Sequence, residues 1–247
     1  MGEPVARGLE VRVSGANAAR AYQEARALAE AGAEALLSFG LAGGLDPSLG
    51  PGAIVIGTEV LEVHGPIEVP KEVGLRDTLN AVFNLRGQMA RAREPLPPVS
   101  ADARFVADRR LIERLAEAAG RRALAGPLIG VDHIVRTRAE KSTLLVRTRG
   151  FAVDMESQGV ARAASECGLP FGALRVVLDP SNRELPAALA RSVKPDGSTT
   201  LAPILTGLLV NPFELGAYLS LAYDSALALR TLGRVGRRLG PALLGGL

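Results

Sequence analysis

Two acidic side chains stand where an apolar run gives way to a helix of small residues. The stretch FAVDMESQGVARAA, residues 151–164, places Asp154 and Glu156 on either side of Met155. In a structural reading, Asp154 caps a helix that begins near Glu156, and both acids stabilise its N-terminus. In a chemical reading, a carboxylate at the end of a buried strand accepts hydrogen bonds from vicinal hydroxyl groups such as those of a ribose.

Another carboxyl group, that of Asp179, ends the run ALRVVLD, and Pro180 then forbids continuation of a strand ladder. In a structural reading, Asp179 begins a turn through DPSN. In a chemical reading, burial raises the pKa of this carboxyl group, which then protonates the nitrogen of a departing heterocycle. Two acids with such different roles are typical of glycosyl cleavage.

The glycine-rich stretch GLAGGLDP, residues 40–47, lacks the Gly-Lys-Ser/Thr of a phosphate-binding loop and does not match GxGxxG. Backbone amides in such a turn can bind an anion, and a tight turn without a ligand is the alternative. His64, His133 and Cys167 are far apart in the sequence, so we predict no metal site.

Alternating strand and helix patterns must position these segments, and they predict an α/β sheet with helices on both faces. We expect strands over residues 10–15, 34–40, 53–65, 123–135, 150–156 and 171–179, and helices over 17–32, 104–119, 139–147 and through Cys167. Ligands bind beyond the carboxyl ends of strands in such sheets. This rule gathers the glycine stretch, VDHI, VDME and VVLDPSN at one edge.

Composition favours a globular chain with a sizeable core over a disordered chain. The 247 residues are 47% hydrophobic, with a net charge of +3 and no long linker, so we expect one domain over 1–247 with a C-terminal extension over 186–247. The basic cluster RTLGRVGRRLG carries no aromatic residues, which favours a solvated helix face over nucleic-acid binding. No signal peptide or membrane-length apolar run is present, which predicts a cytoplasmic protein.

Three segments together resemble the nucleoside phosphorylase and nucleosidase superfamily. SFGLAGGLDPSLGPGAIVIGTEV is similar to the family's G-S-A-G-G-L-x-P-x-L-x-x-G-D-I-V segment, AVDMES to V-x-M-E-x, and RVVLDPSNRE to R-x-x-S-D. With VSGANAARA and NPFELGAYLSLAYDSALALRTL, they look most like the phosphorylase associated with hopanoid biosynthesis, which is thought to act on adenosylhopane. The resemblance covers roughly residues 9–185.

The resemblance implies a three-layer αβα fold around a central mixed sheet, and cleavage of the N-glycosidic bond of a purine nucleoside with an apolar 5′ substituent. Glu156 would bind the ribose hydroxyl groups, and Asp179 would protonate the purine N7. Nucleoside-binding positions would be Met155, Val153, Phe151, His133 and Ile134. The nucleophile would lie near Gly15, Ala42 and Gly43. No cofactor is expected, and phosphate is the candidate co-substrate.

Departures from the family pattern keep alternatives open. Leu41 stands where the family usually has Ser or Thr, and Ser38 where many phosphorylases have Arg, so hydrolysis is an alternative to phosphorolysis. Leu178 replaces the serine that commonly precedes the catalytic acid. Rival functions are a methylthioadenosine or S-adenosylhomocysteine nucleosidase and a catalytically inactive nucleoside-binding protein. Before LEVRV only GEPVARG is present, so either Glu3 replaces the family's N-terminal acid or the first strand of the sheet is missing.

The C-terminal part combines a proline-containing stretch over 184–211 with a long helix. We expect the helix to pack through the stripe Leu215, Leu219, Ala222, Ala226 and Leu229. This stripe either packs on the sheet or a partner subunit, or forms an apolar lip for a lipid-like 5′ group. A homo-oligomer and peripheral membrane contact are the corresponding expectations.

Overall fold

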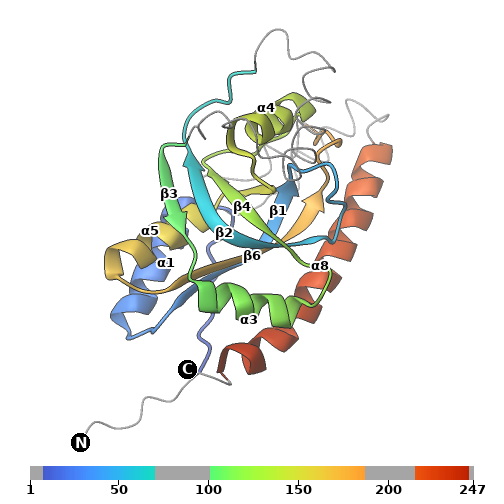
Figure 1. Cartoon of the computed structure of the whole chain (residues 1–247). Coiled ribbons are helices and arrows are strands. Elements are labelled where there is room, and N and C mark those ends of the chain that lie inside the picture. The colour runs from blue at the N-terminus through green and yellow to red at the C-terminus, as the bar shows by residue number, and fades with distance from the viewer. Residues whose placement is uncertain (1–7, 70–100, 187–214, 245–247) are drawn as a thin grey trace, which may run out of the picture.

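Six strands form a mixed sheet in the part of the chain that the structure, a computed structural model, describes: residues 8–69, 101–186 and 215–244 (Figure 1). The strands are β1 (Leu36–Gly44), β2 (Ile54–Val63), β3 (Ala103–Val106), β4 (Leu124–Val131), β5 (Ala152–Asp154) and β6 (Phe171–Asp179). The helices are α1 (Ala18–Glu30), α3 (Arg109–Ala119), α4 (Arg138–Thr148), α5 (Ser157–Cys167) and α8 (Leu215–Leu244).

The strand order β3-β2-β4-β5-β1-β6 contains two groups of opposite direction. Strands β2, β4 and β5 are mutually parallel, and β1 is parallel to β6 but antiparallel to β5. Strand β2 also pairs with β6, so the sheet curves back on itself. The mixed α/β sheet predicted from the sequence is therefore confirmed.

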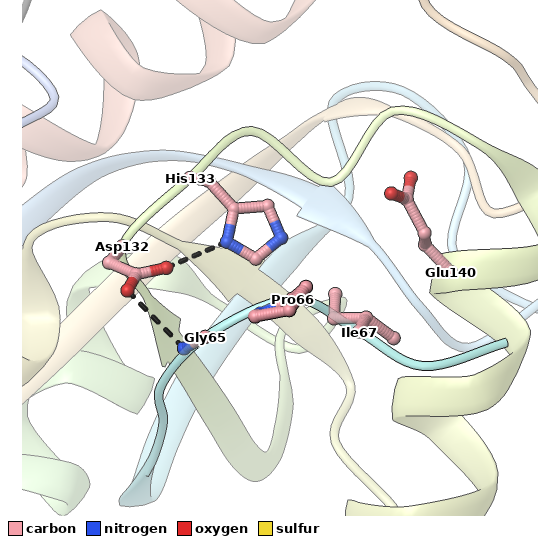
Figure 2. Close-up of a pocket in the computed structure, with 6 residues that line it drawn as sticks. All are labelled: Gly65, Pro66, Ile67, Asp132, His133 and Glu140. Atoms are coloured by element: carbon pink, nitrogen blue, oxygen red, sulfur yellow. Dashed lines mark hydrogen bonds and ion pairs between the residues drawn. The ribbon is translucent and has the colours of Figure 1, made fainter.

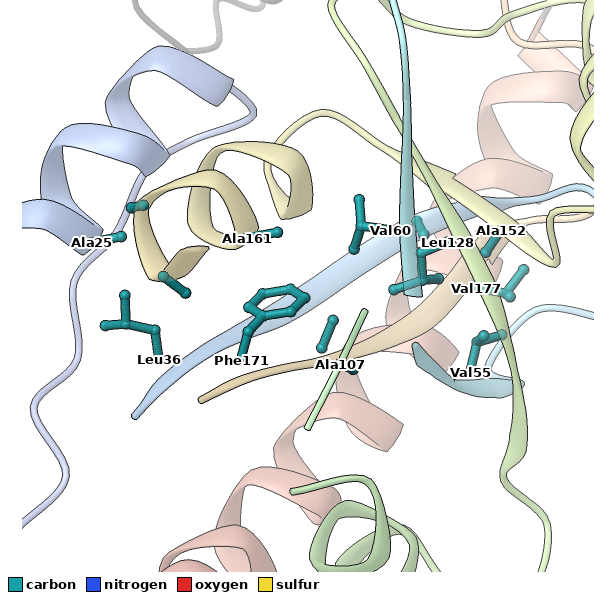
Figure 3. Close-up of a cluster of buried hydrophobic side chains, with 14 of the residues drawn as sticks. Ala25, Leu36, Val55, Val60, Ala107, Leu128, Ala152, Ala161, Phe171 and Val177 are labelled. Atoms are coloured by element: carbon teal, nitrogen blue, oxygen red, sulfur yellow. The ribbon is translucent and has the colours of Figure 1, made fainter. Parts of the chain in front are cut away.

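Helices cover both faces of the sheet. One core cluster joins α1 and α5 to the sheet through residues that include Ala25, Ala161 and Phe171 (Figure 3). A second joins α3 and α8 to β2 and β6, and a third joins α4 to β2, β4 and β5. Polar caps start these helices: the side chain of Asn17 accepts from Arg20 N at 2.8 Å, and Thr137 forms a capping box with Glu140.

Two predicted elements differ from the observed ones. Residues 10–15 are not a strand; Val11 and Val13 are exposed, and the segment pairs with no strand among the described residues. The helix expected over 104–119 is divided into β3 and α3, because the carboxylate of Asp108 caps a helix that starts only at Arg109.

The glycine stretch was expected to form a turn, but its first part, as far as Gly44, belongs to strand β1. The turn comes afterwards, where Oδ1 of Asp46 accepts a hydrogen bond from Ser48 N at 2.7 Å. Glycines in this part of β1 let side chains of neighbouring elements approach the strand backbone.

Helix α8 packs through a different face from the one predicted. Leu219 is 63% exposed and Leu229 is 54% exposed, while Ala222 and Ala226 are also exposed; the side chain of Leu215 lies outside the described residues. The buried positions are Leu221, Asp224, Ala228, Thr231, Val235, Leu239 and Leu243. Apolar residues occur around the whole helix, so the sequence did not define a single stripe.

Glu3 and most of the stretch 184–211 lie outside the described residues. Among the helices that the structure does describe, none combines the length and the apolarity required to cross a membrane.

Candidate functional site

The loop between β5 and α5 separates the roles of its two acids. Oδ1 of Asp154 accepts the backbone N–H groups of Glu156 at 2.8 Å and Ser157 at 2.7 Å, so the predicted capping role of Asp154 is confirmed. The side chain of Glu156 makes no capping bond to its own helix. Its carboxylate is therefore left for contacts outside α5.

Residues before α1 hold one oxygen of Glu156. Oε1 accepts hydrogen bonds from Ser14 Oγ at 3.1 Å and Ala16 N at 2.7 Å. Gly15 and Ala16 both have left-handed backbone, with φ of 62° and 45°, which aims the Ala16 amide at the carboxylate. Gly159 in α5 allows this approach, because a side chain there would collide with the backbone oxygen of Ala18.

Arg175, in the middle of β6, holds the other oxygen. Its Nη2 lies 3.4 Å from Oε2 of Glu156 and 3.0 Å from Oδ1 of Asp154. Nη2 also donates to Ser38 Oγ at 2.7 Å, and Nε donates to Ser157 Oγ at 3.2 Å. Arg175 is fully buried, so these contacts form an internal charge network beneath Glu156.

The second acid, Asp179, lies at the end of β6 and is almost fully buried. Its Oδ2 forms an ion pair with Nζ of Lys141 from α4. Burial raises the pKa of Asp179, and the charge of Lys141 opposes this rise only in part. The raised pKa expected from the sequence is thus present, with a buried partner that was not expected.

Both acids belong to the same face of the sheet. Arg175, which pairs with Glu156, and Asp179 are four residues apart in β6, and side chains at even spacing share a face. Val177 between them packs in the cluster of α1 and α5, whereas Leu174 and Val176 pack on the α8 side. At this spacing along an extended strand, the Cα atoms of Arg175 and Asp179 lie about 13 Å apart.

Small residues of β1 lie between the two acids. A side chain at Gly40 would meet Nη1 of Arg175 and would come within 3.6 Å of Oε2 of Glu156. A Cβ at Gly43 would lie 3.5 Å from both carboxylate oxygens of Asp179. Ala42 is buried between these glycines.

The sequence pattern placed the glycine stretch, VDHI, VDME and VVLDPSN together at the carboxyl ends of parallel strands. The strands that end in these segments do not all run in the same direction. Strand β5 runs antiparallel to β1, and within β1 it pairs only with Gly43 and Gly44. Asp179 lies beside Gly43 because the β1–β6 register shifts between Ala42 and Gly43. Mixed strand direction and this bulge, which the sequence pattern does not encode, bring the segments together.

A cavity of about 520 Å³ lies at the N-terminal end of α4 and is lined by Gly65, Pro66, Ile67, Asp132, His133 and Glu140 (Figure 2). Nδ1 of His133 is hydrogen-bonded to Oδ1 of Asp132 at 2.7 Å, and this contact lowers the pKa of Asp132. Neither Glu156 nor Asp179 lines this cavity. Glu140, which does, directly precedes Lys141 in α4.

The remaining predicted nucleoside-binding residues lie in three places. Cγ1 of Val153 lies 3.4 Å from where a Cβ at Gly43 would be. The half-buried Met155 packs on the core cluster of α4. The ring of Phe151 instead packs onto Gly126 near the start of β4, in the core cluster of α1 and α5. Ile134 is half-buried and follows the cavity residue His133.

Sequence reasoning gave no role to Lys141 or Arg175. Arg175 did leave a signal, because a charged residue inside the apolar run FGALRVVLD requires a buried partner. Lys141 left none, since a lysine in the helix RAEKSTLLVRT looks like an ordinary surface residue.

Solved structures share this fold. The 5′-methylthioadenosine/S-adenosylhomocysteine nucleosidase of Neisseria meningitidis, in complex with methylthio-immucillin-A, is 21% identical with a TM-score of 0.51, over 90% of this chain and 79% of that chain. The corresponding nucleosidase of Helicobacter pylori, with butyl-thio-DADMe-Immucillin-A, is 16% identical with a TM-score of 0.51, over 79% and 77%. Futalosine hydrolase of Helicobacter pylori is 17% identical with a TM-score of 0.51, over 89% and 76%.

The family model of the phosphorylase superfamily matches residues 5–209, which include both acids, Arg175 and Lys141. Because this match spans well over half of the 247 residues, the chain belongs to the phosphorylase superfamily.

Proposed function

We propose that the protein cleaves the N-glycosidic bond of a purine nucleoside. The observation that carries the proposal is the pair of acids on one face of the sheet, each held by its own buried cation: Glu156 by Arg175 and Asp179 by Lys141. Family membership supports the same class of reaction.

In the proposed mechanism, Glu156 binds the ribose hydroxyl groups. Oε1 is engaged by Ser14 and Ala16, while a carboxylate offers about four acceptor positions, so Oε2 retains capacity beyond its contact with Arg175. The side chain of Glu156 is 21% exposed, which leaves it accessible from the site. Positive charge that develops on the ribose in the transition state is stabilised by this carboxylate.

Asp179 protonates N7 of the purine as the bond to the ribose breaks. Burial raises the pKa of Asp179, and this direction favours proton donation to the base. The base would approach Asp179 past Gly43, where a Cβ would lie 3.5 Å from both carboxylate oxygens. Water or phosphate near Gly15, Ala42 and Gly43 would attack the anomeric carbon, and no cofactor is required.

For the 5′ side we propose an apolar substituent, such as the hopane group of adenosylhopane. A second cavity, of about 380 Å³, has a polar lining of Arg138, Asn182, Arg183, Glu184 and Ser220, so the apolar surface for this group would come from the part of α8 beside it. Leu219 and Tyr223 flank Ser220 along α8 and are 63% and 74% exposed. An apolar group covering them would be stabilised by roughly 0.8 kcal/mol per buried CH₂.

The test is a substrate panel. Purified protein is incubated with adenosine, 5′-methylthioadenosine, S-adenosylhomocysteine and adenosylhopane, each with and without phosphate, and adenine, free pentose and pentose 1-phosphate are quantified. Adenine release supports the proposal, and preference for adenosylhopane supports the apolar substituent. Preference for the small thio-nucleosides would assign the rival nucleosidase activity. Binding without adenine release under every condition would overturn cleavage.

The Gly43→Ala substitution tests the position of the reacting base. The new methyl group would lie 3.5 Å from both oxygens of Asp179 and 3.4 Å from Val153 Cγ1, which are ordinary contacts, so we expect melting within a few degrees of wild type. Because the methyl covers the carboxylate, we expect kcat/KM for adenine release to fall at least about tenfold. Gly50→Ala, where the methyl meets nothing within 4 Å, is the control. Equal activity of both variants would contradict a base approaching Asp179 past Gly43.

A further inference from the structure

Lys141 is a buried cation that the mechanism above leaves without a role. It lies in the first turn of α4 and is fully buried. Its Nζ donates to Oδ2 of Asp179, to the carbonyl oxygen of Pro180 at 2.9 Å and to that of Arg183 at 3.0 Å. These three acceptors account for the three N–H groups of an ammonium.

A contribution to the stability of the fold does not explain why a lysine is buried at this position. A positive charge near the N-terminus of a helix is opposed by the helix dipole. A buried ion pair is also often no more stabilising than apolar side chains of the same volume. A lysine with both disadvantages, whose partner is the proposed acid, points to a chemical role.

Resting on the proposed function, we infer that Lys141 is a positioning residue that fixes Asp179 beside Gly43 and stores the proton that Asp179 passes to the leaving base. Two geometric facts support this. Lys141 contacts the carboxylate directly, and the same Nζ ties down the backbone of Pro180 and Arg183 that follows Asp179.

The proton steps balance. In the resting pair, Nζ is an ammonium and Asp179 is a carboxylate. A proton moves from Nζ to Oδ2, which gives an amine and a carboxylic acid; the acid then protonates N7 as the C1′–N9 bond breaks and its electron pair passes to the purine. Water forms the new bond to C1′ and releases one proton, and a proton from solvent restores the ammonium. The sum is nucleoside plus water giving base plus pentose.

Other charges facing the pair come from two elements. Arg183, just after β6, lowers the pKa of Asp179, and its guanidinium is itself paired with Asp224 of α8. Burial, which raises the pKa of Asp179, is the largest influence, followed by the opposing charge of Lys141. Removing Lys141 therefore removes the charge that lowers the pKa of Asp179, and burial then raises this pKa further.

The experiment measures kcat and KM across pH for wild type, Lys141→Met and Lys141→Gln, with the nucleoside that wild type cleaves best. Without Lys141, only a protonated Asp179 can act, so kcat of both variants should fall as pH rises over a range where wild-type kcat is flat. At the alkaline end we expect a loss of about 100-fold or more, with little change in KM. The Gln variant keeps two N–H donors, enough for two of the three acceptors, so it replaces the Met variant if that variant does not fold.

Leu144→Ala is the matched control, because Leu144 is also fully buried in α4 and makes no charge contact. It should lower the melting temperature while leaving the pH profile of kcat unchanged. A second readout needs no substrate: an acid whose pKa is raised by folding loses stability as pH rises, so the melting temperature of Lys141→Met should fall with pH more steeply than that of wild type.

The outcomes separate the two proposals. A loss of kcat by the same factor at every pH, or parallel curves of melting temperature against pH, would overturn the role of Lys141 while leaving the proposed function in place. A wild-type protein that releases no base from any nucleoside of the panel would overturn the proposed function and this proton store together.

Discussion

Replacing Asp179 with Asn is expected to lower kcat for adenine release by about 10²- to 10⁴-fold, the range attributed to general acid catalysis. The amide cannot give up a proton to N7 in place of the carboxylic acid. Its oxygen can still accept from Lys141, which also keeps the carbonyl oxygens of Pro180 and Arg183. The variant should therefore fold, with a loss of stability below about 3 kcal/mol, the lower end for breaking a buried pair.

Asp108→Asn makes the same chemical change at a position without a catalytic role. Asp108 caps α3 by accepting from Leu111 N at 3.0 Å, and asparagine caps equally well. This control should keep both the wild-type kcat and the melting temperature. Adenine release by Asp179→Asn at the wild-type rate, measured by base formation under saturating nucleoside, would remove Asp179 from the mechanism.

Most of the regular structure follows from local sequence patterns. Asn17 and Thr137 cap the helices that the periodicity indicates, and the β-branched runs IVIGTEV and FGALRVVLD form β2 and β6. The failures have a common cause in tertiary context. The alternation of LEVRV is that of a strand, but a strand also needs a neighbour with free backbone groups, and residues 10–15 pair with none among the described residues.

Of the residues in the candidate site, only the acids could be predicted from the sequence. Asp154, Glu156 and Asp179 stand at strand ends, where the sequence pattern alone draws attention to them. The cations that hold them come from elsewhere: Lys141 is 38 residues from Asp179 along the chain. Which face of α4 is buried depends on the packing of α4 against β2, β4 and β5, and a lysine in a polar helix pattern does not reveal it.

Replacing Arg175 with Met should produce the largest loss of stability among single substitutions at the site. The guanidinium binds two carboxylates and two hydroxyl groups, and the side chain of Asp154 is only 2% exposed. Methionine fills similar volume but leaves this carboxylate buried with backbone donors alone. Removing one partner of a buried pair costs about 3–5 kcal/mol, which for a chain of this size lowers the melting temperature by roughly 6–20 °C.

The double variant Arg175→Met/Asp154→Asn identifies the cause. If the loss arises from an uncompensated charge, neutralising Asp154 should recover a large part of it, so the two substitutions are not additive. The amide of the new asparagine keeps an oxygen for the N–H groups of Glu156 and Ser157, so the start of α5 is preserved. Additive losses in thermal unfolding would instead show that Arg175 acts through packing, and the charge network beneath Glu156 could not then be what orients it toward a ribose.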